Sequence, residues 1–170
     1  DMGVNMAGFG ICDDDVVCKA SEQEIIRRYY KSMCAVTQGL ASQSEVSKIE
    51  TLMTQLGISS DDRPVVKAAA DKSEQTGAPA VALELNDGRI VTGKTSSLLG
   101  SSAACLLNAL KTLADIDDDK LLISPQVIEP IQKLKLGHMG NRNPRLHTDE
   151  ILIALSICAV TDPDAQKAME

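Results

Sequence analysis

The segment from residue 137 to residue 147 holds the side chains best suited to chemistry in this sequence. It contains both histidines of the chain, two arginines and two asparagines, although the chain carries a formal net charge of −7. Arg142 and Arg145 can each hold a carboxylate or a phosphate through paired N–H donors. His147 or His138 can transfer a proton near neutral pH. We therefore treat Asn141, Arg142, Arg145 and His147 as candidate ligand-binding residues.

This loop has two further interpretations. Its arginines are also typical of a solvated surface loop that pairs with acidic neighbours. The second further interpretation is a metal site built from His138, His147 and Asp149, but these residues place no close pair of ligands on one helical face. We predict no metal site, and the residues identify no cofactor.

A second candidate is the run Gly88–Thr95, which matches the phosphate-binding signature G-x-x-x-x-G-K-[ST]. In a true phosphate loop, backbone N–H groups surround the phosphates, and the enzyme would use Lys94 and Thr95. The residues between the two glycines are Arg, Ile, Val and Thr, and the β-branched ones favour a strand. Asn86-Asp87-Gly88 directly precedes them and is typical of a hairpin turn. We predict a hairpin over residues 80–92, and the phosphate loop is the alternative.

Two subdomains are expected to position these residues. Ser21-x-x-Glu24 and Ser42-x-x-Glu45 are capping boxes that predict helices ending near Gln38 and Gly57. These helices form an antiparallel pair in a helical subdomain over residues 1–60, which opens with a glycine-rich loop. The α/β subdomain over residues 61–170 is predicted to contain the hairpin and helices at about 63–76, 101–114, 125–136 and 148–160.

Three details of the second subdomain follow from local patterns. The apolar run Leu121-Leu122-Ile123 predicts a short buried strand. Pro130 is expected to kink or restart the helix that contains it. The helix at 148–160 is apolar nearly all round, which predicts a central position.

Composition excludes several classes of function. The acidic net charge repels a phosphate backbone, and the only aromatic residues are Phe9, Tyr29 and Tyr30, so we expect no nucleic-acid binding. The longest strongly apolar run, Ile151–Val160, is about half of what spans a bilayer, so we expect no membrane insertion. Five cysteines at wide spacing, with no C-x-x-C, fit reduced and mostly buried thiols in a cytoplasmic protein. We see no secretory leader. Asp1 is not an initiator residue and the last helix pattern runs into Glu170 with no terminating signal, so we expect a fragment.

Several long strings then carry a family resemblance: DMGVNMAGF, QEIIRRYY, DDRPVV, TGAPAVALELNDGRIVTGKTSSLLG, ISPQVIEPIQKLK and NPRLHTDEILIALS. With these, the chain resembles the uncharacterised bacterial family known as domain of unknown function 1846, or uncharacterised protein family 0371. The resemblance covers essentially the whole chain. Because members are much longer, it implies that an N-terminal α/β domain and a short C-terminal portion are missing here. It brings no established activity or catalytic residue.

The resemblance also implies a fold, namely a helical insert followed by a three-layer α/β unit with cytidine-deaminase-like topology. Zinc deaminases need a His or Cys followed two residues later by Glu at one helix start, and P-C-x-x-C at another. Here Cys105 is followed by leucines and Pro125 by Gln126, so the zinc motif is absent. The implied fold class is thus helix-rich α/β without zinc-deaminase chemistry.

We expect a domain of a larger bacterial protein that binds a small molecule or builds a homo-oligomer and contacts the missing domains. A nucleotide-binding or phosphate-transferring enzyme that uses Lys94 and Thr95 is the first alternative. A structural interaction module is the second. The residues assign no reaction and no catalytic role.

Overall fold

The computed structural model describes residues 13–170. The chain divides into two compact units, and the boundary along the sequence falls between Arg63 and Pro64. The predicted glycine-rich opening loop and Cys12 lie outside the described residues. Within residues 13–170, no helix is both long and apolar enough to cross a membrane.

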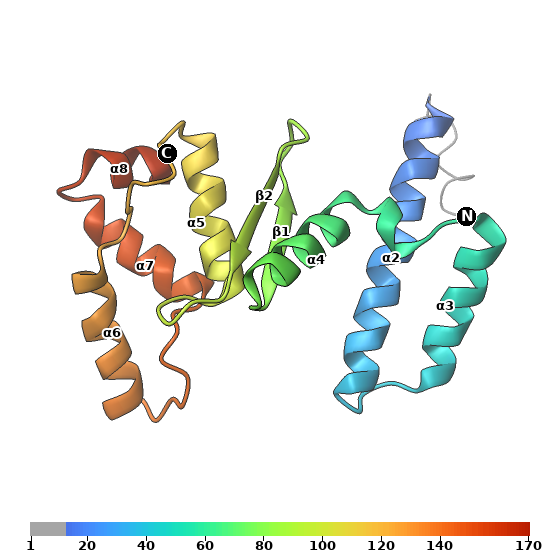
Figure 1. Ribbon diagram of the computed structural model, residues 1–170, viewed down its shortest axis with the longest axis horizontal. Helices are drawn as coiled ribbons and strands as arrows, with labels where there is room; N and C mark the ends of the chain where they lie inside the picture. Colours follow the sequence, from blue (N-terminus) through green and yellow to red (C-terminus); the bar gives the residue numbers. More distant parts are fainter. Residues whose placement is uncertain (1–12) are drawn as a thin grey trace. The chain divides into compact units, whose positions relative to one another are not determined.

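The first unit is a helical pair, α2 (Asp14–Thr37) and α3 (Gln43–Leu56), followed by the short helix η1 (Ser60–Asp62). The two long helices run antiparallel (Figure 1). Ile26 is fully buried on α2 and Val46 is 2% exposed on α3, so these two residues centre the small core.

The predicted start of α2 at Ser21 is wrong, because the helix begins at Asp14 and runs through Ser21. Its N-cap is Asp13, whose side chain accepts a hydrogen bond from the backbone N–H of Val16 at 3.0 Å. An aspartate cap followed by two acidic residues in the first turn stabilises this earlier start through the helix dipole.

The second unit is built around a hairpin of β1 (Ala80–Glu84) and β2 (Ile90–Lys94). The strands pair antiparallel, with Ala82 opposite Thr92. Gly88 closes the turn with a φ of +83°, a left-handed conformation that glycine adopts without steric cost. Its N–H donates to the Leu85 carbonyl at 2.9 Å.

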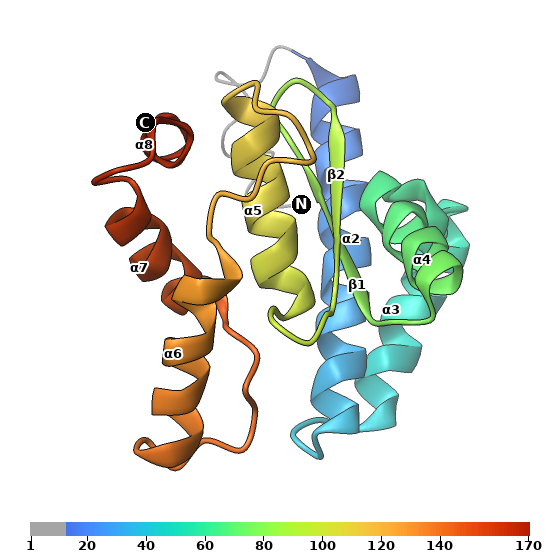
Figure 2. The same cartoon turned by 60° about the vertical axis from the view of Figure 1, so that its left-hand side comes forward.

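Two helices cover this hairpin. Helix α4 (Pro64–Thr76) and helix α5 (Ser101–Leu113) each pack against both strands. They lie on opposite faces, so helix, hairpin and helix form three layers (Figures 1 and 2). The result is a helix-rich α/β protein.

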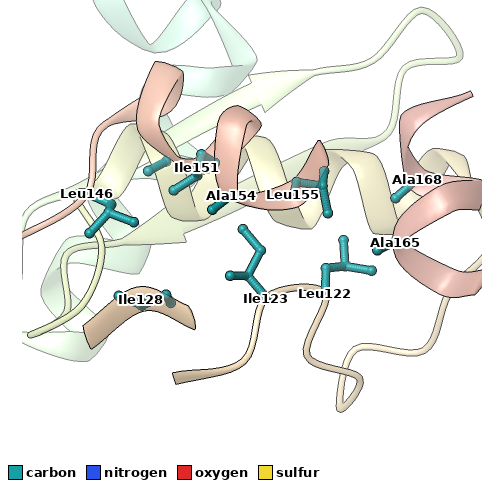
Figure 3. Close-up of a cluster of buried hydrophobic side chains, with 10 residues drawn as sticks. Leu122, Ile123, Ile128, Leu146, Ile151, Ala154, Leu155, Ala165 and Ala168 are labelled. Atoms are coloured by element: carbon teal, nitrogen blue, oxygen red, sulfur yellow. The ribbon is translucent and has the colours of Figure 1, made fainter. Parts of the chain in front are cut away.

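The main core contains residues of α5 and of the C-terminal helices α6 (Pro125–Gly137), α7 (Thr148–Cys158) and α8 (Pro163–Met169). Figure 3 shows its side chains between these elements. The buried residues are Ala103, Leu122, Ile123, Ile128, Leu146, Ile151, Ala154, Leu155, Ala165 and Ala168.

Three local predictions for this unit are wrong or incomplete. Leu122 and Ile123 are buried as expected, but residues 121–123 form no strand, because no strand of the described chain is in position to pair with them. Helix α6 does not restart at Pro130, which lies inside it. Helix α7 buries only one face, and Ile153 and Ile157 on the other are 62% and 60% exposed.

The contact between α5 and β2 is unusually close. A Cβ atom built on Gly93 would lie 2.1 Å from the backbone nitrogen of Cys105. The Cys105 thiol donates to the Val91 carbonyl at 3.4 Å, and the Asn108 amide donates to the Thr92 carbonyl at 2.9 Å. Gly93 is therefore the residue that lets the helix approach the strand.

We predict that Gly93→Ala lowers the free energy of unfolding by about 2 kcal/mol or more, because its methyl group would force the helix backbone away from the strand. Chemical denaturation monitored by circular dichroism measures the change. Gly137→Ala is the matched control, since a Cβ there meets nothing within 4 Å. Equal stability of the two variants would contradict this account of Gly93.

Candidate functional site

A surface cleft of about 460 Å³ brings together segments that are far apart in the sequence. Two of its residues lie at the base of the hairpin, four at the start of α5, and four around the start of α7. They are Pro79, Thr95, Gly100, Ser101, Ser102, Ala103, Asn143, Arg145, His147 and Thr148. We call this the α5–α7 cleft.

A short backbone ladder holds the two helix starts beside each other. Leu99 and Leu146 form an isolated parallel β-bridge. The N–H of Leu146 donates to the Leu98 carbonyl at 2.9 Å, and the N–H of Gly100 donates to the Leu146 carbonyl at 3.1 Å. Leu146 is fully buried, so this contact belongs to the main core.

Two hydrogen bonds, one from the backbone of Arg145 and one from its guanidinium, position this residue in the cleft. Its Nε donates to the Ser96 carbonyl at 2.7 Å, and its backbone N–H donates to the Asn143 side chain at 3.1 Å. Within residues 13–170, these are its only hydrogen bonds as a donor. Among the described residues, the terminal nitrogens of the guanidinium have no hydrogen-bond partner.

An ion pair between Lys135 and Glu150 holds the loop at residues 145–147 in place. Lys135 of α6 is only 2% exposed. Its ammonium donates to the Arg145 carbonyl and to the Glu150 carboxylate, both at 2.7 Å. The same carboxylate oxygen accepts the backbone N–H of His147 at 2.8 Å. One lysine and one glutamate thus set the path of residues 145–147.

The environment of Glu150 lowers its pKa. Burial by itself would raise the pKa of this carboxyl, but the hydrogen bonds from Lys135 and from the His147 N–H outweigh burial. Glu150 is consequently ionised at neutral pH, and it also lies in the first turn of α7, where a negative charge favours the helix dipole.

The cleft is electrostatically suited to an anion. The first N–H groups of a helix have no partner within the helix, and its N-terminus carries a partial positive charge. Helix α5 is preceded by Gly100, which has no side chain to cap it, and α7 by His147. Arg145 lies between these two helix starts; the first turn of α7 carries Asp149 and Glu150, whereas the first turn of α5 carries no acidic residue, so the uncompensated helix dipole is that of α5.

The structure brings together only some of the predicted site residues. Arg145, His147 and Thr95 line the α5–α7 cleft, although Thr95 came from the phosphate-loop interpretation. Asn141, Arg142 and Lys94 are not among its lining residues. The N–H of Asn141 donates to the Lys135 carbonyl at 3.1 Å, and the other two side chains are exposed.

Other contributors were missed by sequence reasoning. Ser101 and Ser102 indicated only a helix start, and Asn143 was not chosen as a candidate residue within its loop. Lys135 gave no signal, because a lysine in an amphipathic helix normally faces solvent. Helix α7 begins at Thr148, and its N-cap is His147.

The phosphate-loop interpretation of Gly88–Thr95 is contradicted by the backbone. Gly88 lies in the hairpin turn, whereas Gly93 is paired with Val81 inside the strand. An extended strand separates the two glycines, so their N–H groups cannot surround one phosphate. Lys94 and Thr95 do not form part of such a loop.

The cysteines and metal ligands are dispersed. In the described part of the chain, no group of three His, Cys, Asp or Glu side chains is placed to hold a metal ion, and this includes the trio around His138. Cys105 is buried, and burial raises the pKa of its thiol. Cys18 and Cys34 are exposed, which corrects the expectation that the cysteines are mostly buried.

These features define a helix-rich α/β protein whose candidate site is a cleft between two helix starts, with Arg145 among its lining residues. Residues 61–170 match the family model described as "Domain of unknown function DUF1846, C-terminal". Residues 1–57 match its N-terminal counterpart. The chain belongs to this family of uncharacterised function, as the sequence resemblance predicted.

Similar proteins occur in several bacteria, each with the name UPF0371 protein. The chain is 56% identical over 170 residues to the one from Streptococcus thermophilus strain LMD-9. It is 55% identical to those from Corynebacterium aurimucosum and from Streptococcus pneumoniae strain CGSP14. All of this chain is covered in each case, but it spans only 34% of each relative's length. It is therefore part of a larger protein.

We predict that Lys135→Met destabilises the second unit by roughly 3 kcal/mol, because Glu150 would keep a partly buried charge without its partner. This figure is at the low end for buried pairs, since the Glu150 side chain is 22% exposed. Urea denaturation gives the value. Lys133→Met on the same helix is the control, because Lys133 is exposed and should lose almost no stability.

The lowered pKa of Glu150 also predicts a pH dependence. A carboxyl with a lower pKa in the folded state binds fewer protons than it does when unfolded, so it stabilises the fold above its ordinary pKa of 4.5. That stabilisation is lost as the pH falls below this value and through the folded-state pKa. The stability difference between wild type and Glu150→Gln should therefore shrink in acid. A difference that stays constant with pH would refute this.

Proposed function

We propose that the second unit binds a small anion, a carboxylate or a phosphate, in the α5–α7 cleft. The observation that carries this proposal is the position of Arg145, whose guanidinium is held by the Ser96 carbonyl between two helix N-termini. Guanidinium groups and free helix N–H groups are both common partners of carboxylates and phosphates.

The surroundings of Arg145 support a built site rather than a solvated loop. The backbone on either side of this residue is tied down by the Leu99–Leu146 bridge and by the buried Lys135. Because the donors are held in place before a ligand arrives, little ordering cost accompanies binding. His147 and the hydroxyl groups of Ser101 and Ser102 add further donors along the same walls.

We also propose that this unit has the topology of the cytidine deaminases without their zinc chemistry. The succession of α4, the hairpin, α5 and α6 supports this topology, as does Pro125 at the start of α6. The donor set does not suit zinc, because Cys105 lies within α5 with its thiol on the Val91 carbonyl. Without ligands and a nearby Glu, a zinc-activated water has no place here.

The binding proposal is tested on the full-length protein with inorganic phosphate and with acetate as probes. We predict that Arg145→Ala weakens the binding of at least one probe by about tenfold or more, which corresponds to one charged hydrogen-bonding group. Isothermal titration calorimetry measures the affinity.

Arg142→Ala is the matched control, because it removes the same charge from the same loop but outside the cleft. It should leave affinity within about twofold, since an exposed charge in salt contributes little. An equal loss in both variants would mean that only net charge matters. The absence of saturable binding to either probe would favour a structural module instead.

A further inference from the structure

The hairpin has two edges, and its hydrogen-bonding pattern shows which groups point outwards. Thr95 N–H donates to the Pro79 carbonyl, and Leu85 N–H donates to the Arg89 carbonyl, both at 2.8 Å. In an antiparallel ladder, hydrogen-bonded pairs alternate with non-hydrogen-bonded pairs. The pairs Ala82–Thr92 and Glu84–Ile90 are therefore non-hydrogen-bonded, and the N–H and C=O groups of these residues point away from the partner strand.

The outward edge of β1 has the composition of a central strand. Ala80, Val81, Ala82 and Leu83 are all apolar, and no charge interrupts them before Glu84. Continuous apolar runs are typical of strands that are covered on both faces and paired on both edges. Natural edge strands usually carry a lysine, a proline or a bulge that blocks further pairing, and Ala80–Leu83 contains none of these.

The outward edge of β2 is different, because side chains already occupy it. The Asn108 amide donates to the outward-facing Thr92 carbonyl. The groove along this edge has a volume of about 600 Å³ and is lined by polar side chains, including Lys72, Arg89 and Asp118. Such charged and capped groups are typical of a true sheet edge.

The described residues offer no strand to fill the position beside β1. The sheet within residues 13–170 contains only β1 and β2. The apolar run at residues 121–123 buries Leu122 and Ile123 in the main core cluster instead of pairing with β1. A sheet of two strands is also narrower than most sheets, which typically have about four to six strands.

We propose that in the full-length protein a further strand pairs with the free edge of β1, and that it comes from the same polypeptide outside this chain. The relatives support this source, because the chain spans only 34% of their length. The added strand extends the middle layer between α4 and α5 and makes β1 an interior strand. It covers Leu83, which is 42% exposed without it.

Hydrogen–deuterium exchange by NMR on the wild-type full-length protein tests the pairing directly. The Ala82 and Glu84 amides should exchange at least ~100-fold more slowly than those of Thr92 and Ile90, because only the former donate to a neighbouring strand. Equally fast exchange of all four amides overturns the proposal. Protection of Ala82 that disappears on dilution, together with dissociation of a dimer, also overturns it, since the strand would then come from a second copy.

A pair of proline variants gives an independent readout at directly opposite positions. Ala82→Pro removes a donor that we assign to a strand pair, whereas Thr92→Pro removes one at the capped edge, where proline is tolerated. The Tm of full-length Ala82→Pro should fall several degrees below that of Thr92→Pro. Similar Tm values for the two variants would contradict the proposal, and the wild-type exchange experiment remains decisive if Ala82→Pro does not fold.

Discussion

The second unit depends on how closely α5 can approach the hairpin. At Gly93 the helix backbone occupies the space where any other residue would have a side chain. The Cys105 thiol and the Asn108 amide then bond to strand carbonyls, so polar groups at the interface are satisfied rather than buried alone. Helix α5 also contacts α7 and α8, which makes it the element shared by the sheet layer and the main core.

The candidate site follows from this arrangement. Once α5 is fixed against β2, its first turn lies beside Thr95, and the Leu99–Leu146 bridge brings the start of α7 to the same place. The buried Lys135 and Glu150 then hold the intervening loop so that Arg145 faces the cleft. Backbone geometry thus places one arginine beside two helix starts, without an excess of basic residues.

Sequence reasoning predicted the parts of this protein that depend on neighbours along the chain. Asn86-Asp87-Gly88 and the β-branched run after it indicated a hairpin because turn chemistry and χ1 stiffness act locally. The helix boundaries at Gly57 and Pro125 follow from residue types with fixed backbone preferences. The predicted helix start at Ser21 was wrong because a capping pattern inside a helix has the same residues as one at a helix start. The helix begins instead after the Asp13 cap.

The sequence by itself determined the family, the helix-rich α/β class and the presence of a basic loop, because long identical strings and local propensities carry that information. Only the tertiary structure showed that Arg145 lines the cleft and Arg142 does not, and that Thr95 and His147 line the same cleft. It also showed that Lys135 is buried. These outcomes depend on contacts between residues tens of positions apart, such as Ser96 with Arg145. The same physical reason explains residues 121–123, since an apolar run becomes a strand only where another strand is present to pair with it.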